Sequence, residues 1–196
     1  MQPPRFLASA VCAAVLFVAT CAIAAPANRN TPTPPPSISN PLSGFLALFT
    51  GIPRATVTYP GKYKPGTIIV NTAERRLYLV LGNGQAMRYG VGVGREGFTW
   101  SGVSTVSAKR EWPDWTPPEE MLKRRPDLPH HMVGGPGNPL GARALYLGDT
   151  EYRIHGSNEP HTIGTAASAG CIRMTNDDVI DLYDRVKVGT TVIVKR

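Results

Sequence analysis

The sequence predicts a mainly β fold with a few short helices. Three observations support this prediction. The chain of 196 residues contains 19 Pro and 20 Gly, which favours many turns. Its apolar residues fall in short runs rather than in long helical periods. Turn-forming pairs, Asn83-Gly84 and Gly148-Asp149, separate neighbouring runs as in β-hairpins. The length allows one domain of ordinary size with appendages.

The N-terminus has the pattern of a secretory signal peptide over residues 1–24. Arg5 supplies the positive region, residues 6–23 form the apolar core, and Ala24 ends an A-x-A cleavage site. Two alternatives remain open. An apolar run of about 18 residues is at the lower limit for an uncleaved membrane anchor, and Cys21 offers a lipoprotein site, although an unfavourable Thr precedes it. A cleaved signal predicts a periplasmic protein that meets the membrane only if the segment stays attached.

Residues 25–62 are predicted to form a Pro-rich basic linker and N-terminal arm. Residues 26–41 are too polar and too rich in Pro to bury a core, so they form an extended spacer. The apolar stretch 42–51 fits a helical turn packed on the domain, a partner contact or a flexible tether, and the sequence does not choose among these. The folded domain is expected over residues 63–196.

The net charge of +7 is unevenly distributed. All acidic residues lie at Glu74 or later, and the chain from Glu74 onward carries a net charge of only +2. A nucleic-acid-binding domain would need a basic stripe on its folded surface, so this class of partner is not expected. A basic arm near an anionic envelope polymer fits the distribution better.

Seven strands are predicted in the folded domain. Residues 87–93 alternate clearly: Tyr89 and Val91 share one face, and Gly90 and Gly92 share the other. A face made of glycine allows another backbone to approach closely, although it also fits a simple bend. The remaining predicted strands cover residues 67–71, 76–81, 103–109, 144–147, 151–155 and 190–194.

Two helices are predicted. Thr116 and Glu119 have the spacing of a capping box for a helix over 117–124. A second helix begins after Thr175 or Asn176, either of which suits an N-cap. Its buried stripe follows the helical period at Val179, Leu182, Tyr183 and Val186.

Residues 112–139, rich in Pro and Gly, are predicted to form a lid-like insertion beside a cleft. Trp112 and Trp115 in this insertion suit either a substrate groove or ordinary packing.

Cys171 and His155 are the candidate catalytic pair. His155 ends a predicted strand whose apolar face holds Tyr152 and Ile154, so its ring is expected to leave the core side. After removal of residues 1–24, Cys171 is the lone cysteine, which in an oxidising compartment is a liability unless its reactivity is used. A thiolate attacks carbonyls and needs a nearby base to form. The alternative is a buried, inert cysteine.

The segments that surround this pair resemble those of the L,D-transpeptidase catalytic family (YkuD-like). The resemblance extends from about residue 65 to residue 195. Its motifs are H-G at 155–156, S-A-G-C-I-R-M at 168–174, P-G-T-I-I-V-N-T, R-L-Y-L-V-L-G-N-G, W-P-D-W-T-P-P and G-N-P-L-G-A-R-A-L-Y-L. The family often has a second His where this chain has Ala169, so His155 must act as the base alone.

This resemblance implies mixed β-sheets in a sandwich-like fold and an enzyme of peptidoglycan synthesis, cell wall biogenesis and cell shape. A tetrapeptide stem would form a thioester with Cys171, releasing its terminal D-Ala. The acyl group would then pass to an amine, either of another stem (a 3→3 cross-link) or of an envelope protein. The resemblance also implies that the carbonyl of Gly156 orients the imidazole. No cofactor or metal is implied, and the sequence contains no Walker loop or dinucleotide fingerprint.

Three further residues are predicted to contact the substrate: Ser168, Gly170 and Arg173. The N–H groups of Gly170 and Cys171 are candidate oxyanion donors. Arg173 suits a substrate carboxylate and, equally well, a structural ion pair.

Two other functions are kept open. A hydrolase with the same pair would use water as the acceptor and act on stem peptides or protein–peptidoglycan links. A non-enzymatic zinc protein would use His155, His161 and Cys171, but their spacing matches no common zinc pattern.

Overall fold

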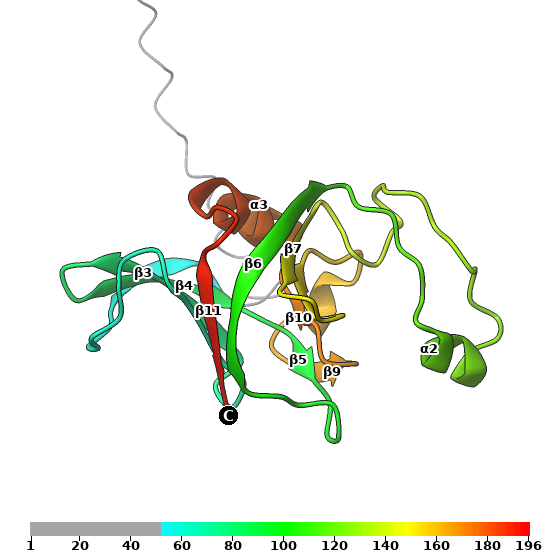
Figure 1. The fold of residues 1–196 in the computed structure, drawn as a ribbon, viewed down its shortest axis with the longest axis horizontal. Helices are drawn as coiled ribbons and strands as arrows, with labels where there is room; N and C mark the ends of the chain where they lie inside the picture. The colour runs from blue at the N-terminus through cyan, green and yellow to red at the C-terminus, as the bar shows by residue number, and fades with distance from the viewer. Residues whose placement is uncertain (1–51) are drawn as a thin grey trace, which may run out of the picture. The chain divides into compact units, whose positions relative to one another are not determined.

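The computed structural model describes residues 52–196 (Figure 1). The predicted signal peptide, the spacer and the 42–51 stretch lie outside these residues. Nine strands form one sheet in the order β1-β4-β3-β2-β11-β6-β7-β8-β10, and β5 pairs with β9 separately. The strands are β1 (Ala55–Thr58), β2 (Ile68–Asn71), β3 (Arg76–Gly82), β4 (Gln85–Gly90), β5 (Val93–Gly94), β6 (Gly102–Glu111), β7 (Arg143–Leu147), β8 (Arg153–His155), β9 (Ala166–Ser168), β10 (Ile172–Arg173) and β11 (Thr191–Lys195).

Within residues 52–196 the helices are few and short. They are α2 (Glu119–Arg124), α3 (Asn176–Arg185) and the 3-10 turn η1 (Pro160–Thr162). Figure 1 shows α3 packed against the strands and α2 held away from them on a long connection. No helix within residues 52–196 is long and apolar enough to cross a membrane.

The large sheet is mixed. β11 pairs in parallel with β2 and antiparallel with β6, and β10 pairs in parallel with β8. The long strand β6 joins the two halves, because its first part pairs with β11 and its second part pairs with β7. These features confirm the predicted fold class of mixed β-sheets with few helices.

The hydrophobic core lies on the side of the sheet that α3 covers. Ile68, Ile69 and Val70 of β2 are all fully buried, which fits a strand near the middle of a sheet that is covered on both faces. The core residues from other elements include Leu77, Tyr89, Leu145, Ile154, Ile172, Leu182 and Val192.

Helix α3 begins as the sequence predicts. The Thr175 hydroxyl accepts a hydrogen bond of 3.2 Å from the N–H of Asp178, so Thr175 rather than Asn176 is the N-cap. Val179, Leu182 and Val186 of the predicted stripe are buried. The cap fixes the start of α3 directly after β10, the strand that follows Cys171.

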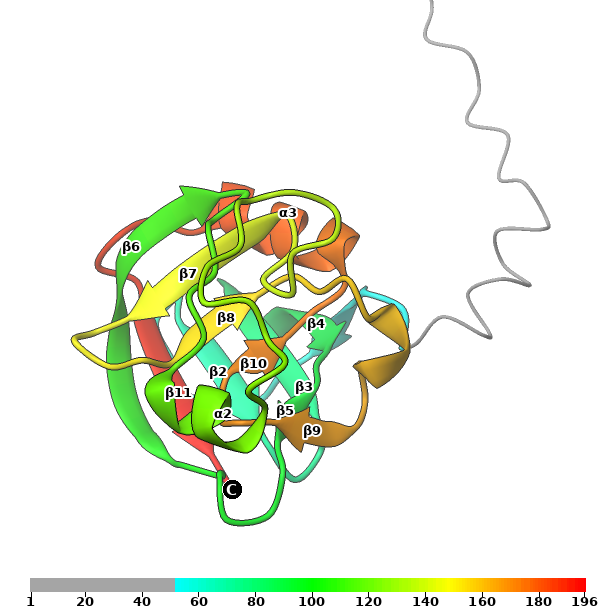
Figure 2. The ribbon, with the colours of Figure 1, turned by 90° about the vertical axis from the view of Figure 1, so that its right-hand side faces the viewer.

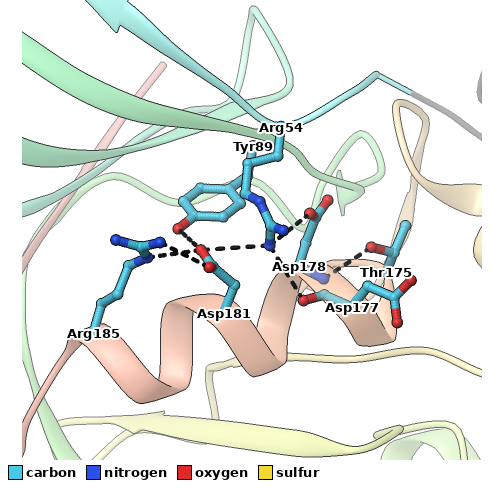
Figure 3. A network of polar contacts seen from close by, with 7 residues as sticks. All are labelled: Arg54, Tyr89, Thr175, Asp177, Asp178, Asp181 and Arg185. Carbon is cyan, nitrogen blue, oxygen red and sulfur yellow. Dashed lines mark hydrogen bonds and ion pairs between the residues drawn. The ribbon is translucent and has the colours of Figure 1, made fainter. Parts of the chain in front are cut away.

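A polar network fastens the outer face of α3 to the strands (Figure 3). Asp181 accepts hydrogen bonds from the Tyr89 hydroxyl at 2.6 Å and from the Arg185 Nε at 2.8 Å. The Arg54 guanidinium lies 3.4 Å from Asp181 and 3.6 Å from Asp178. The hydrogen bond from Arg185 is the main reason why the pKa of Asp181 lies below its usual value. The network therefore links the segment before β1 to both α3 and β4.

The predicted start of the folded domain at residue 63 is too late. Residues 55–58 form β1, which pairs antiparallel with β4 at the edge of the sheet. β1 is only four residues long and lies between Pro53 and Pro60, so its sequence alone gives a weak strand signal.

The predicted capping box of the first helix is wrong. Helix α2 begins at Glu119, with Pro118 at the N-cap and no side-chain cap. The Thr116 hydroxyl lies instead 3.3 Å from the Nδ1 of His131. Pro118 disfavours helical backbone in the residue before it, which moves the start of the helix toward the C-terminus.

Candidate active site

Strands β8 and β10 bring the two candidate catalytic residues into one cleft. The strands lie side by side (Figure 2), with Ile172 opposite Ile154 and Arg173 opposite His155. Cys171 directly precedes β10, so it lies two positions, roughly 7 Å, from His155 along the neighbouring strand. Both residues line a cleft of about 550 Å³.

The His155 ring is buried and held by one hydrogen bond. Its exposed fraction is 4%, and its Nδ1 donates to the carbonyl oxygen of Gly156 at 2.6 Å. In a neutral imidazole this places the proton on Nδ1 and leaves Nε2 as an acceptor. Burial lowers the pKa of His155 to about 4, with smaller contributions from the charges of Arg173 and Arg153. The ring is therefore neutral at neutral pH and able to accept a proton.

The Cys171 thiol is also neutral in this environment. Burial raises its pKa, and this outweighs the opposing effect of Arg153 and Arg173. The sulfur lies 3.8 Å from the carbonyl oxygen of Glu151. Within residues 52–196, no hydrogen bond joins the thiol to the His155 ring. The resting pair is thus a thiol and a neutral imidazole, not an ion pair.

Ser168 braces the loop that carries the cysteine. Its hydroxyl donates to the carbonyl oxygen of Cys171 at 2.5 Å and accepts from the N–H of Gly170 at 3.1 Å. Its exposed fraction is 2%. The hydroxyl hydrogen is therefore used inside the loop, which differs from the predicted contact between Ser168 and a substrate.

The prediction that Gly170 offers an oxyanion donor also needs correction. Its N–H already donates to Ser168, because the tight turn brings the hydroxyl under it. The N–H of Cys171 makes no hydrogen bond within the described part of the chain. This N–H remains as the candidate donor.

The conformation of Gly170 is one that only glycine adopts readily. Its φ is +114°, and a Cβ at this position would lie 2.5 Å from the Tyr152 ring. Trp100 fixes the same residue from the other direction, since its Nε1 donates to the Gly170 carbonyl oxygen at 2.9 Å. The Trp100 and Tyr152 rings stack with centroids 4.6 Å apart. The two aromatic rings therefore set the backbone that leads into Cys171.

The sequence analysis did not identify Trp100. It lies in the loop between β5 and β6, about 70 residues from Gly170, and no local pattern connects the two.

Arg173 lines the cleft and forms an ion pair. Its Nη1 lies 3.3 Å from Oε2 of Glu159, and this ion pair is the second of the two predicted roles. The backbone of Arg173 exchanges hydrogen bonds of 2.9 Å with Gly92. A Cβ on Gly92 would lie 2.9 Å from the carbonyl oxygen of Thr162, so the close backbone approach predicted for this face is confirmed.

The 112–139 segment forms one wall of the cleft. Trp115 lines the cleft together with Met121, Arg124 and Arg125. Trp112, by contrast, is not among the lining residues, and 41% of its side chain is exposed.

His161 lies on the surface, in η1. In the described residues, no group of three or more His, Cys, Asp or Glu side chains is arranged to hold a metal ion.

Comparison with known proteins identifies relatives of this site and fold. Residues 65–194 match the family model of the L,D-transpeptidase catalytic domain, YkuD. A probable L,D-transpeptidase, ErfK/SrfK of Escherichia coli, is 42% identical over 134 residues, which cover 64% of this chain and 42% of that protein. The chain thus spans less than half the length of this curated relative.

Two solved structures show related folds. An L,D-transpeptidase from Mycobacterium smegmatis is 18% identical, with a TM-score of 0.54 over 66% of this chain and 58% of that one. A Brucella melitensis protein named as a probable carnitine operon oxidoreductase is 51% identical, with a TM-score of 0.50 over 74% of this chain and 94% of that one.

Proposed function

The chain belongs to the L,D-transpeptidase catalytic domain family, and from this premise we propose that it is a periplasmic cysteine acyltransferase acting on peptidoglycan stem peptides. The observation that carries the proposal is the cleft shared by Cys171 and a neutral, oriented His155. A general base must be unprotonated at the working pH, and burial keeps this imidazole so.

The first half-reaction forms a thioester. Nε2 of His155 takes the thiol proton while the sulfur of Cys171 attacks the carbonyl carbon before the terminal D-Ala of a tetrapeptide stem. The C–S bond forms, the C–N bond breaks, and the proton passes to the departing amine of D-Ala. Both groups start neutral, so proton transfer accompanies the attack. Rotation of the thiol away from Glu151 toward the ring precedes it, because catalytic hydrogen bonds are often unformed before substrate binds.

The second half-reaction transfers the acyl group. An amine of another stem, or of an envelope protein, attacks the thioester carbonyl. A new C–N bond forms, the C–S bond breaks, and the proton returns through His155 to the sulfur. The N–H of Cys171 stabilises the oxyanion in both steps, since the other N–H of this turn is used by Ser168. The carbonyl of Gly156 keeps the imidazole in the required tautomer.

Mass spectrometry of the intact protein tests the proposal. Incubation with a tetrapeptide stem or a carbapenem should give an adduct on Cys171; for the stem, its mass is that of the peptide acyl group without the terminal D-Ala. Cys171→Ala and His155→Ala should give no adduct. His161→Ala is the matched control, because this exposed histidine does not line the cleft, and it should react like the parent protein.

Product analysis with and without an added amine identifies the acceptor. Cross-linked product that requires the amine supports transpeptidation, and free tripeptide in both reactions indicates hydrolysis. An adduct in the Cys171→Ala protein would refute the assigned nucleophile. Activity that a chelator removes and zinc restores would favour metal chemistry instead.

A further inference from the structure

The cleft has an excess of positive charge. Five arginines line it, against the two carboxylates of Glu151 and Glu159. The lining arginines are Arg95, Arg124, Arg125, Arg153 and Arg173. Arg125 pairs with Asp127 and Arg173 pairs with Glu159, whereas the other three have no carboxylate partner within the described residues. A water-filled pocket with unneutralised guanidinium groups attracts anions.

The guanidinium groups of two of these unpaired arginines lie near the same aromatic ring. The guanidinium carbon of Arg95 lies 4.3 Å from the centre of the Phe98 ring, and that of Arg124 lies 5.4 Å from it. The two cations are therefore at most about 10 Å apart, close to the distance at which salt screens charges at physiological ionic strength. Each gains cation–π attraction from the ring, but they repel each other unless an anion lies between them.

The pair also has a fixed relation to the nucleophile. The N–H of Arg95 donates to the carbonyl oxygen of Ser168 at 3.0 Å, and the N–H of Phe98 donates back to Arg95 at 2.9 Å. Ser168 in turn holds the carbonyl of Cys171. The backbone of Arg95 is thus tied to the loop that carries the sulfur. Arg124 approaches from the other wall, as the last residue of α2.

We propose that Arg95 and Arg124, gathered on Phe98, form a subsite that binds a carboxylate of the peptide substrate. The guanidinium fork matches a carboxylate with two parallel hydrogen bonds. The site selects acidic peptides, with the bound carboxylate at a side position and not at the bond that is cleaved. This inference rests on the proposed function for its peptide substrate, and it adds a recognition site on two segments outside the catalytic motif.

Peptide binding to the Cys171→Ala protein tests the subsite without catalysis. Isothermal titration calorimetry would compare a tetrapeptide stem that has its internal carboxylates free with the same peptide amidated at those positions. Addition of Arg95→Ala or Arg124→Ala should weaken binding of the acidic peptide about 10-fold, the size of one charge-assisted hydrogen bond. Binding of the amidated peptide should be the same in both variants as in the parent.

Arg110→Ala is the matched control, because it removes an exposed arginine outside the cleft. It should change neither affinity. Arg95→Lys and Arg124→Lys provide second variants that keep a cation over the ring but lose the fork, and thermal unfolding checks that every variant is folded. The lysine variants should bind the acidic peptide more weakly than the parent and more tightly than the alanine variants.

Three results would overturn the subsite. Unchanged affinity for the acidic peptide in both alanine variants is the first, and an equal loss for the acidic and amidated peptides is the second. The third is a parent protein that binds neither peptide. The proposed function is judged separately, by acylation of Cys171 in the unmodified protein. Acylation of Cys171 together with any of these three results would refute the subsite alone, and absence of any adduct would refute the enzyme function.

Discussion

Acid should destabilise this protein partly through His155. The ring is 4% exposed, and burial lowers its pKa to about 4 from the ordinary value of 6.5. Between these two values the unfolded chain binds a proton that the folded chain does not. Above pH 6.5 the ring is neutral in both states and does not destabilise the fold. As the pH drops from 6.5 to 4, the free energy of unfolding therefore falls progressively.

The size of this loss in unfolding free energy follows from the lowering of the His155 pKa. Each pKa unit corresponds to about 1.4 kcal/mol, so a shift of this size predicts a loss of about 3 kcal/mol between pH 6.5 and pH 4. Other groups also titrate in this range, so the comparison must be with a variant that lacks the imidazole. His155→Gln keeps a donor for the Gly156 carbonyl and has no titrating group.

Urea unfolding at several pH values between 7.5 and 4 measures the effect. The free energy of unfolding of the parent protein should fall by about 3 kcal/mol more than that of His155→Gln over this interval. His161→Gln serves as the matched control for a His→Gln substitution, because this side chain is exposed. Parallel curves for the parent and His155→Gln would show that the folded protein binds the proton as readily as the unfolded chain. That result would refute the argument from burial.

Four further predictions concern the loop and the scaffold. Gly170→Ala should slow acylation of Cys171 roughly 10-fold or more, because left-handed backbone costs a residue with a Cβ about 1–2 kcal/mol and the new methyl meets Tyr152; an unchanged rate by mass spectrometry would contradict this. Trp100→Phe keeps the ring stack but loses the hydrogen bond to Gly170, so unfolding free energy should fall by about 1 kcal/mol. Cys171→Ser should react far more slowly with a carbapenem, because a hydroxyl is a weaker nucleophile than a thiol; equal adduct formation over time would argue against attack by sulfur. Asp181→Ala removes the acceptor of the buried Tyr89 hydroxyl, so the free energy of unfolding in urea should fall by about 1–3 kcal/mol while the acylation rate stays unchanged.

Much of the fold was predictable because its signals are local. Short apolar runs bounded by turn residues indicated most of the strands, and Thr175 with the stripe after it indicated α3. β1 was missed because four residues in a polar setting gain their stability from pairing with β4, a contact 30 residues away. The start of α2 was misplaced because the capping-box pattern does not take Pro118 into account. This proline disfavours helical backbone at the residue before it.

Part of the candidate site was also predictable from the sequence. Cys171 and His155 stand out by residue type, but their meeting in one cleft depends on the parallel β8–β10 pairing, and no strand was predicted at residues 172–173. The use of the Gly170 N–H by Ser168 was not predictable, because it depends on the path of a tight turn. Trp100, Arg95 and Arg124 come from distant segments, and only the folded chain places them beside the nucleophile.

The position of β11 constrains the order of assembly. This strand is synthesised after every other strand of the sheet, yet it fills the place between β2 and β6. Until β11 is present, β2 lacks its parallel partner and the first part of β6 lacks its antiparallel partner. The ribosome must therefore release almost the whole domain before the sheet closes.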